Sequence, residues 1–251
     1  MMSGETAVDR SVYALSGADV LTFLQGMVTN DVLPLARSPG IVWSALLTPQ
    51  GKYLADFFVV HTADHLLLDI KTAVAEAAVR RLLMYRLRAD AQIVRTDLHV
   101  TRGLGPASND AVRDPRHPSL GWRAYGAPGH PPQIDWDAIR VAATVPETGI
   151  ELTADTFILE ARFEALNGVD FRKGCYVGQE VTARMKHKTE LRKGLVRVGV
   201  AGSAPIGTEI LADGKPAGTL YTQSGGFGIA YLRHDRAGLL LTAGEAVVTL
   251  I

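Results

Sequence analysis

The segment from Arg192 to the C-terminus constrains the fold most, because short β-rich runs alternate there with glycines. The runs read KGLVRVGV, GTEILADG, KPAGTLYTQ, FGIAYLR and EAVVTLI. Their residue types favour strands, and the glycines between them favour turns. This pattern is typical of a small β-barrel or β-sandwich, so we expect one at the end of the chain.

The N-terminal part opens with a strand that leads into a short helix. The run SVYALSG reads as a strand that ends near Ser16. Ser16 is placed to cap a helix over residues 18–25, with Asp19 as its capping-box partner. Gly26 then marks the end of this helix.

Several strands and a longer helix follow up to residue 97. The runs IVWSALLT and KYLADFFVVH, separated by PQG, predict a hairpin, and HLLLDI and AQIVRTD predict further strands. Between these last two, TAVAEAAVRRLLMYRL predicts an amphipathic helix whose apolar face carries Val74, Ala78, Leu82 and Tyr85. Because helices and strands do not strictly alternate, we expect an α+β fold rather than a doubly wound nucleotide fold.

The middle of the chain changes character at Gly103. Residues 103–132 are rich in Gly, Pro, Asn, Asp and Arg, and they include DPRHPSLGWRAYGAPGHPP. Such a segment cannot form a continuous helix or a central strand, so we expect an irregular connection around one short strand, GWRAYG. A helix is expected over residues 134–143, and VPETGIEL predicts a further turn.

Composition limits the classes of function. The 251 residues are 47% hydrophobic, which is enough for a substantial core. Basic and acidic residues number 26 each, so the overall charge gives no reason to expect binding to nucleic acid or to an acidic membrane. The single cysteine cannot form an internal disulfide, and the longest apolar runs are far shorter than the roughly 20 residues of a membrane helix. We therefore expect a soluble, cytoplasmic protein.

The single cysteine, Cys175, lies in the stretch FRKGCYVGQEVTARMKH. The residues after it predict a helix, so the thiol is expected at the helix entrance beside Arg172 and Lys173. The helix dipole and these two cations favour a reactive thiolate. The alternative is a small buried core residue, since free cysteines are often buried. His187 reads as a lone surface histidine rather than a catalytic base.

Metal binding by the chain alone is not predicted. One cysteine with scattered histidines lacks any paired ligand spacing, so the chain cannot enclose a zinc ion or an iron–sulfur cluster in cysteine ligands. The alternative of a cluster shared with a partner protein is left open by the sequence.

Two acidic residues stand in otherwise apolar patterns. Asp56 alternates with Leu54 and Phe58 in a predicted strand, and Glu160 lies in the helix-like run DTFILEARFEAL. Taken alone, the first pattern favours an Asp56 at a sheet edge or facing solvent, and the second favours a solvated Glu160 on a helix. A role in lining a pocket is the alternative, because a buried carboxylate needs a partner.

Four stretches together resemble the folate-binding YgfZ family, which is related to the aminomethyltransferase (T-protein) of the glycine cleavage system. They are FLQGMVTNDV, SALLTPQGKYLADFFV, VPETG and, most specifically, GVDFRKGCYVGQEVTARMKH. The resemblance runs from about residue 10 to the C-terminal barrel. It implies a discontinuous, ring-like α+β fold with a folate-binding region at residues 1–100, a second α+β region at 101–190 and a β-barrel at 191–251.

The resemblance also implies roles for particular residues. Cys175 would be a reactive thiol assisted by Lys173 and Arg184. Tetrahydrofolate or a derivative would be bound by a set drawn from several segments, namely Asn30, Asp31, Asp56, Glu160, Gln179 and Glu180. The aminomethyltransferases carry an acidic pair at the strand position of Asp56, whereas this chain has Ala55 at the first place. That departure speaks against aminomethyl transfer.

The family implies a tetrahydrofolate-binding accessory protein in iron–sulfur cluster assembly or repair. Its expected partners are folate and iron–sulfur assembly proteins or client enzymes, without nucleic acid or membrane. A folate-dependent aminomethyltransferase, or another one-carbon transferase, is the alternative. A third possibility is a module in which folate is a structural ligand and the barrel recruits a partner.

Overall fold

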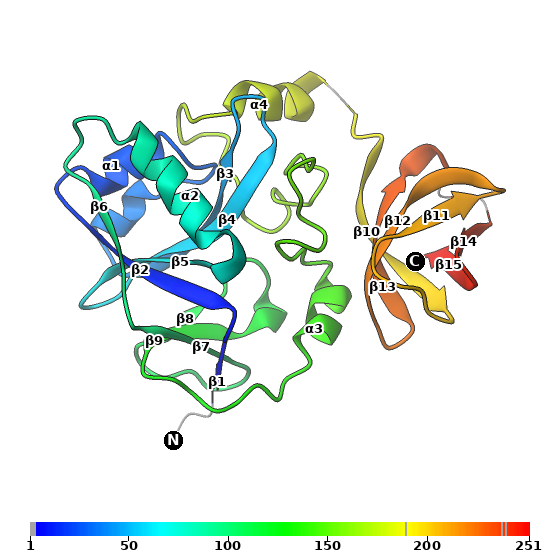
Figure 1. Cartoon of the computed structure of the whole chain (residues 1–251), viewed down its shortest axis with the longest axis horizontal. Coiled ribbons are helices and arrows are strands. Elements are labelled where there is room, and N and C mark those ends of the chain that lie inside the picture. The colour runs from blue at the N-terminus through cyan, green and yellow to red at the C-terminus, as the bar shows by residue number, and fades with distance from the viewer. Residues whose placement is uncertain (1–3, 189, 237, 239) are drawn as a thin grey trace. The chain divides into compact units, whose positions relative to one another are not determined.

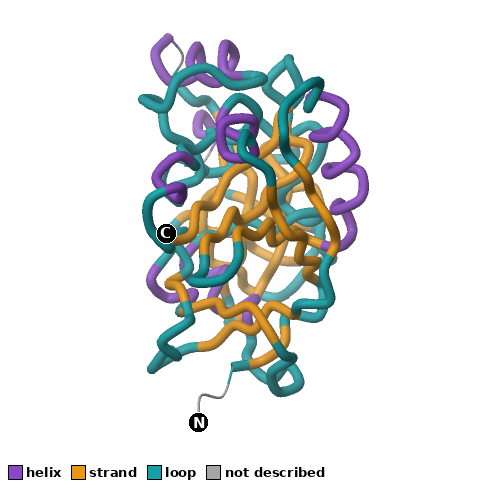
Figure 2. Tube along the Cα trace, turned by 90° about the vertical axis from the view of Figure 1, so that its left-hand side faces the viewer, coloured by secondary structure: helices purple, strands orange, loops and turns teal. Residues whose placement is uncertain are grey.

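The computed structural model describes residues 4–188, 190–236, 238 and 240–251. The chain divides into two compact units, residues 1–134 with 164–181 and residues 135–163 with 182–251. Strands and loops predominate over helices (Figure 2). This confirms the predicted α+β class, whereas the division at residues 100 and 190 stays a prediction.

A five-stranded antiparallel sheet forms the centre of the first unit (Figure 1). Its strands are β3 (Gly40–Leu47), β4 (Tyr53–His61), β5 (Leu66–Lys71), β2 (Arg10–Ser16) and β6 (Gln92–Arg95), in that spatial order. The predicted hairpin is confirmed, because β3 pairs directly with β4. The strands predicted from HLLLDI and AQIVRTD are present as β5 and β6.

One face of this sheet is apolar and is covered by helices. α1 (Val20–Gln25) and α2 (Thr72–Tyr85) pack on it, and a 3-10 helix, η1 (Leu33–Ala36), follows α1. Leu24 of α1, Leu82 of α2 and Phe57 of β4 are fully buried in this core. Alternation along each strand sends the remaining side chains to the opposite face.

Two details of these helices differ from the sequence prediction. Ser16 is the last residue of β2, and α1 begins only at Val20. Asp19 occupies the cap position, but its carboxylate accepts the backbone N–H of Asp90 at 2.9 Å instead of capping α1. In α2 the buried face carries the predicted Ala78 and Leu82 together with Ala75 and Val79, and the predicted Val74 is half-buried. Tyr85, the last residue of the helix, is exposed.

A second, four-stranded sheet belongs to the same unit. It consists of β1 (Glu5–Thr6), β7 (His99–Gly103), β9 (Trp122–Gly126) and β8 (Val112–Arg113), with η2 (Pro118–Leu120) before β9. β9 is the strand predicted in GWRAYG. The predicted irregular connection therefore surrounds a strand that is paired on both sides.

A buried ionic network joins the two sheets of the first unit. Asp69 of β5 accepts a hydrogen bond from Arg10 of β2 at 2.6 Å and one from Arg123 of β9 at 2.7 Å. Arg123 also approaches Asp114 at 3.5 Å, and Arg116 pairs with Asp114 at 2.8 Å. Because Asp69 is fully buried, its charge is tolerated through this pairing and through a hydrogen bond from the Tyr125 hydroxyl at 3.0 Å.

The second unit contains the predicted barrel. β10 (Lys193–Ala201), β13 (Phe227–Arg233), β12 (Lys215–Ser224), β11 (Thr208–Ala212), β14 (Leu241–Ala243) and β15 (Ala246–Leu250) close in that order. The five predicted runs are confirmed as strands, and β14 is an additional short one. η3 (His234–Arg236) follows β13. Val198, Ile210, Leu220 and Ala243 are buried inside.

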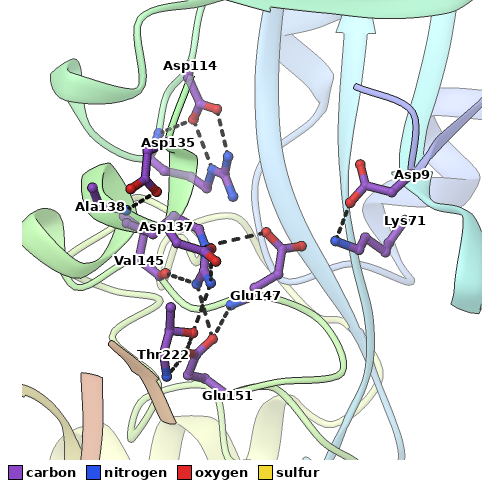
Figure 3. Close-up of polar contacts among 12 residues, drawn as sticks. Asp9, Lys71, Asp114, Asp135, Asp137, Ala138, Val145, Glu147, Glu151 and Thr222 are labelled. Carbon is purple, nitrogen blue, oxygen red and sulfur yellow. Dashed lines mark hydrogen bonds and ion pairs between the residues drawn. The ribbon is translucent and has the colours of Figure 1, made fainter. Parts of the chain in front are cut away.

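Two helices complete the chain, and one is tied to the barrel by a buried arginine. α3 (Trp136–Ala143) matches the helix predicted there, and α4 (Gln179–Lys188) follows the cysteine. Arg140 of α3 donates to Glu151 at 3.2 Å and to the hydroxyl of Thr222 on β12 at 3.0 Å. Thr222 in turn donates to Glu151 (Figure 3). Within the described residues, no helix is both long and apolar enough to cross a membrane.

Replacing Asp69 by Asn should lower the free energy of unfolding by about 3–5 kcal/mol, because Arg10 and Arg123 would lose their shared buried counter-charge. Burial disfavours the Asp69 carboxylate, but the two arginines outweigh it and lower its pKa from 3.8 to about 2. The stabilisation is therefore present above about pH 4 and is lost as the pH falls towards 2. Urea unfolding between pH 2 and 7 measures both effects.

The exposed Asp110 offers a matched control for this test. Asp110→Asn should leave the acid-induced loss of stability unchanged, whereas Asp69→Asn should remove the part that belongs to Asp69. Equal pH slopes in wild type and Asp69→Asn would contradict the assignment.

Candidate functional site

The segment around the cysteine, residues 168–178, lies against the loop that follows α1. We call residues 168–178 the thiol segment and residues 26–32 the helix-end loop. The Thr29 hydroxyl donates to the Gly168 carbonyl at 2.7 Å, and the Asp170 N–H donates to the Thr29 carbonyl at 3.1 Å. The Val177 N–H donates to the Gly26 carbonyl at 3.3 Å. The thiol segment is therefore held along its length by the helix-end loop.

Lys173 is the strongest tie between these two segments. Its ammonium donates to the backbone carbonyls of Gln25 and Val28, the latter at 2.8 Å. It also lies 4.9 Å from the ring centroid of Tyr176. Burial lowers the pKa of Lys173 to about 8, although Asp31 and Asp170 pull in the opposite direction. Lys173 thus braces the backbone beside the thiol.

Gln25 was not singled out from the sequence, yet it connects the predicted residues. Its amide nitrogen donates to Asp31 at 2.9 Å and to the Lys173 carbonyl at 3.1 Å. Its amide oxygen accepts the Val32 N–H at 3.0 Å. Its place as the last residue of a short helix, directly before a glycine, is a signal too weak to distinguish it from an ordinary surface glutamine.

Asn30 and Asp31 belong to the same hydrogen-bonded loop, and their expected contact with folate stays a prediction. The Asn30 amide donates to the Trp43 carbonyl at 2.9 Å and to the Asn167 carbonyl at 2.7 Å. Asp31 accepts the Leu33 N–H at 3.1 Å in addition to the Gln25 amide. Both side chains therefore organise the loop, and both remain partly exposed.

Gly178 explains why the motif needs a glycine before its glutamine. Its φ of +85° lies in the left-handed region, and a Cβ there would stand 2.6 Å from the Thr48 carbonyl oxygen. Thr48 begins the turn between β3 and β4, whose Gly51 has a φ of +75°. Two glycines thus allow the thiol segment to approach this hairpin turn.

Cys175 is exposed, which rules out the buried-core alternative. It follows Gly174, whose φ is +96°, and it lies between the two anchored residues Lys173 and Tyr176. The expectation of a thiol at the helix entrance is wrong, because α4 begins only at Gln179. A helix dipole fades within its first turn, so α4 contributes little to the electrostatics at Cys175.

Of the site residues predicted in α4, one contacts the thiol segment and two are exposed. Gln179 turns its side-chain oxygen back to accept the Tyr176 N–H at 3.2 Å, so it supports the thiol segment. Glu180 and Arg184 are exposed, and Arg184 belongs to the second unit. His187 is exposed as expected.

Asp56 is buried on β4, an interior strand of the sheet, so the edge or solvent-facing interpretation is wrong. Its carboxylate accepts the indole N–H of Trp43 at 2.8 Å and the hydroxyl of Tyr53 at 2.7 Å. Trp43 is also the residue whose carbonyl accepts from Asn30. A chain of hydrogen bonds therefore leads from Asp56 through Trp43 to the helix-end loop.

Glu160 lies in the second unit, and the segment around it forms turns instead of the expected helix. Arg162 has a φ of +66°, which interrupts any helix there. Glu160 is buried rather than solvated, and it accepts the hydroxyl of Tyr231 at 2.6 Å. Burial and this hydrogen bond raise the pKa of Tyr231, so the phenol stays protonated and continues to donate.

Two hollows adjoin these residues, one in each unit. In the first unit a polar hollow of about 450 Å³ is lined by Asn30, Glu164, Asn167, Asp170 and Arg172, among others. In the second, a pocket of about 160 Å³ is lined by Lys193, Tyr221 and Tyr231 with Glu151 and Thr156. Among the described residues, no three metal-ligating side chains form a group that could hold a metal ion.

Comparison with known proteins identifies relatives of the chain. Residues 192–251 match the family described as CAF17, C-terminal beta-barrel domain. The chain is 31% identical to a protein of Mycosarcoma maydis named iron-sulfur cluster assembly factor IBA57 homolog, mitochondrial, over 78% of the chain and 57% of that protein. The human and mouse IBA57 proteins are 29% and 28% identical, each over 90% of the chain and 76% of the relative. The chain thus spans little more than half of the fungal relative.

A solved structure confirms the fold. The glycine cleavage system aminomethyltransferase T from Bartonella henselae superimposes with a TM-score of 0.78 over 97% of the chain and 82% of the transferase, at 14% identity. This likeness shows the fold alone. The homologues are therefore iron–sulfur cluster assembly factors, and the fold is that of the T-protein with a C-terminal barrel. The narrower YgfZ assignment stays a prediction.

Replacing Lys173 by Met should loosen the helix-end loop, because the Gln25 and Val28 carbonyls would lose their shared donor at a cost of about 1–3 kcal/mol. Amide hydrogen exchange should become about tenfold faster in residues 26–32. Folding lowers the pKa of Lys173 from 10.5 to about 8, so the wild type should gain stability as the pH rises between these values. The Met variant should lack that gain.

The exposed Lys215 provides the control. Lys215→Met should leave both the exchange of residues 26–32 and the gain in stability above pH 8 as in the wild type. Unchanged exchange in Lys173→Met would show that the lysine does not brace the loop.

Proposed function

We propose that this chain acts in iron–sulfur cluster assembly and that Cys175 presents its thiolate to a cluster carried by a partner protein. The observation that carries the proposal is the exposed cysteine on a backbone fixed from both sides, by Lys173 and by Tyr176. A thiolate held in this way is accessible to another protein without any unfolding of the chain.

The ligand count explains why a partner is needed. Iron–sulfur clusters are usually held by four cysteine thiolates, and this chain has one cysteine. Cys175 can therefore supply one ligand, and the partner must supply the others. In this scheme the cluster is cargo that passes between proteins, and the chain itself holds no resident metal.

Tetrahydrofolate or a derivative is proposed as the small-molecule ligand. A pterin ring needs a carboxylate facing its paired N–H donors. Glu160 fits this need, because a carboxylate accepts several hydrogen bonds and the Tyr231 hydroxyl provides only one. The pocket of about 160 Å³ is lined by Ala161, the next residue along the chain, and by Tyr231, the partner of Glu160. It is smaller than the roughly 300–1,000 Å³ of drug-sized sites, so it suits the ring rather than the whole ligand.

The buried Asp56 would hold other residues of the site in place and would not contact the ligand itself. Its oxygens already accept from Trp43 and Tyr53. Ala55, next to it, is fully buried on the helix-covered face of the sheet. An acid at that place would be buried among apolar groups, so the geometry gives no support to the alternative of aminomethyl transfer.

Replacing Cys175 by Ser should leave the melting temperature and folate affinity unchanged, because the side chain is exposed and outside the fixed contacts. In cells that lack their own copy, this variant should fail to restore the activity of enzymes with four-iron clusters. Ser203→Ala, an exposed change on the barrel, should restore it fully. Full rescue by Cys175→Ser would sink the thiol proposal.

Replacing Glu160 by Gln should weaken tetrahydrofolate binding about 10- to 100-fold, because a charge-assisted hydrogen bond is worth about 1.5–3 kcal/mol. The amide oxygen still accepts from Tyr231, so the fold should persist. Isothermal titration measures the affinity, with the exposed Glu209→Gln as control. Equal affinity in Glu160→Gln and wild type would show that the pterin binds elsewhere.

A further inference from the structure

The small pocket of the second unit contains a lysine that takes part in no ion pair. The pocket of about 160 Å³ lies where residues 151–161 meet the barrel strands β10, β13 and β12. Lys193 and Leu195 of β10 line it together with Tyr231 of β13 and Tyr221 of β12. In the described part of the chain, no carboxylate pairs with the Lys193 ammonium.

The lining residues of β10 and β13 lie on the outer face of the barrel. Ala230 and Leu232 belong to the barrel core, so Tyr231 between them points outward. Leu195 is directly opposite Tyr231, and directly opposed residues project from the same face. Lys193 is two residues from Leu195, so it projects from that face as well. The lysine and the tyrosine are therefore neighbours on one surface.

Tyr231 brings two opposite charges to this surface. Its hydroxyl donates to the Glu160 carboxylate at 2.6 Å, and the Lys193 ammonium lies 5.2 Å from its ring centroid. The Leu195 N–H donates to the Glu160 carbonyl at 2.8 Å and so fixes the glutamate backbone against β10. Within the described residues, Glu160 and Lys193 share this tyrosine without pairing with each other. Both charges can therefore bind a ligand.

The buried acid that lines the pocket itself is already occupied. Glu151 accepts the Thr222 hydroxyl at 2.5 Å and the Arg140 guanidinium at 3.2 Å (Figure 3). Asp155, which also lines the pocket, is exposed. Glu160 is thus the buried acid with acceptor capacity left beside the pocket, since one carboxylate accepts several hydrogen bonds.

A pterin ring carries donors and an acceptor side by side on one edge. Its 2-amino group and its N3–H donate to a carboxylate, and the 4-oxo oxygen beside N3 accepts. A carboxylate that holds the two donors therefore leaves the oxygen to a neighbouring group of the site. A lysine ammonium has three donors and no acceptor, so it binds an oxo group and repels an amino group at the same place.

We propose that Lys193 determines the specificity of this pocket by donating to the 4-oxo oxygen of the pterin ring. This inference rests on the proposed binding of tetrahydrofolate through Glu160. Lys193 would favour 2-amino-4-oxo pterins over 2,4-diamino pterins, which carry an amino group in place of that oxygen. Because Lys193 is exposed, the effect should be about tenfold, smaller than that of a fully buried polar group.

The alternative partner for Lys193 is the glutamate tail of folate, which carries carboxylates. The position of the ammonium at the Tyr231 ring favours the pterin edge, because Glu160, the proposed anchor of the pterin, binds the same tyrosine. The tail is identical in 4-oxo and 4-amino folates. A comparison of the two compounds therefore separates the two partners.

Isothermal titration of the full chain with tetrahydrofolate and with its 4-amino-4-deoxy counterpart, tetrahydroaminopterin, tests the inference. Lys193→Met should bind tetrahydrofolate about tenfold more weakly and tetrahydroaminopterin no more weakly than the wild type does. Lys193→Glu should reverse the preference, because a carboxylate accepts from the 4-amino group and repels the 4-oxo oxygen. Both variants should keep the melting temperature, since the side chain is exposed.

The control variant is Lys215→Met, which removes an exposed lysine outside the pocket and should keep the wild-type preference. An equal loss of affinity for both compounds in Lys193→Met would overturn the inference, because it would assign the lysine to the tail. An unchanged preference in Lys193→Met would overturn it as well, and either result would leave tetrahydrofolate binding through Glu160 intact. A wild type that binds neither compound would overturn the proposed folate binding and this inference with it.

Discussion

The pairing of Asp69 with Arg10 and Arg123 is the interaction on which the first unit depends. Asp69 is fully buried in the middle strand of the five-stranded sheet, while Arg123 comes from the other sheet. Removing either partner would leave an unpaired charge in the low-dielectric interior. The network therefore ties the two sheets to each other in the folded unit. Phe58, whose ring centroid lies 4.3 Å from the Arg123 guanidinium, adds a cation–π contact.

The two faces of the five-stranded sheet have different roles. The face under α1 and α2 is apolar and supplies most of the core. The opposite face carries the polar groups, and there Trp43 accepts from Asn30 through its carbonyl and donates to Asp56 through its indole. A rigid strand pair thus positions the helix-end loop, and the loop in turn fixes the thiol segment. The position of the thiol segment therefore depends on the pairing of β3 with β4.

The sequence predicted what local patterns determine and missed what distant residues determine. The barrel strands, the β3–β4 hairpin and α3 follow from residue types within a short window, so they were predicted. The burial of Glu160 depends on Tyr231, 71 positions further on, and the brace by Lys173 depends on carbonyls about 145 positions away. Gln25 was missed for the same reason. No pattern in one sequence identifies partners that only the tertiary fold brings together.

In the proposed function, a single cysteine ligand suits transfer of a cluster better than its storage. A protein that stores a cluster surrounds it with four thiolates and releases it slowly, whereas one thiolate holds it weakly. A weak ligand must act within a complex, so the affinity has to come from protein contacts elsewhere. A second binding surface raises the effective concentration of the cluster near the thiol without adding a ligand to it. The thiol segment is fixed along its backbone while its sulfur is exposed, so it is suited to act within such a complex.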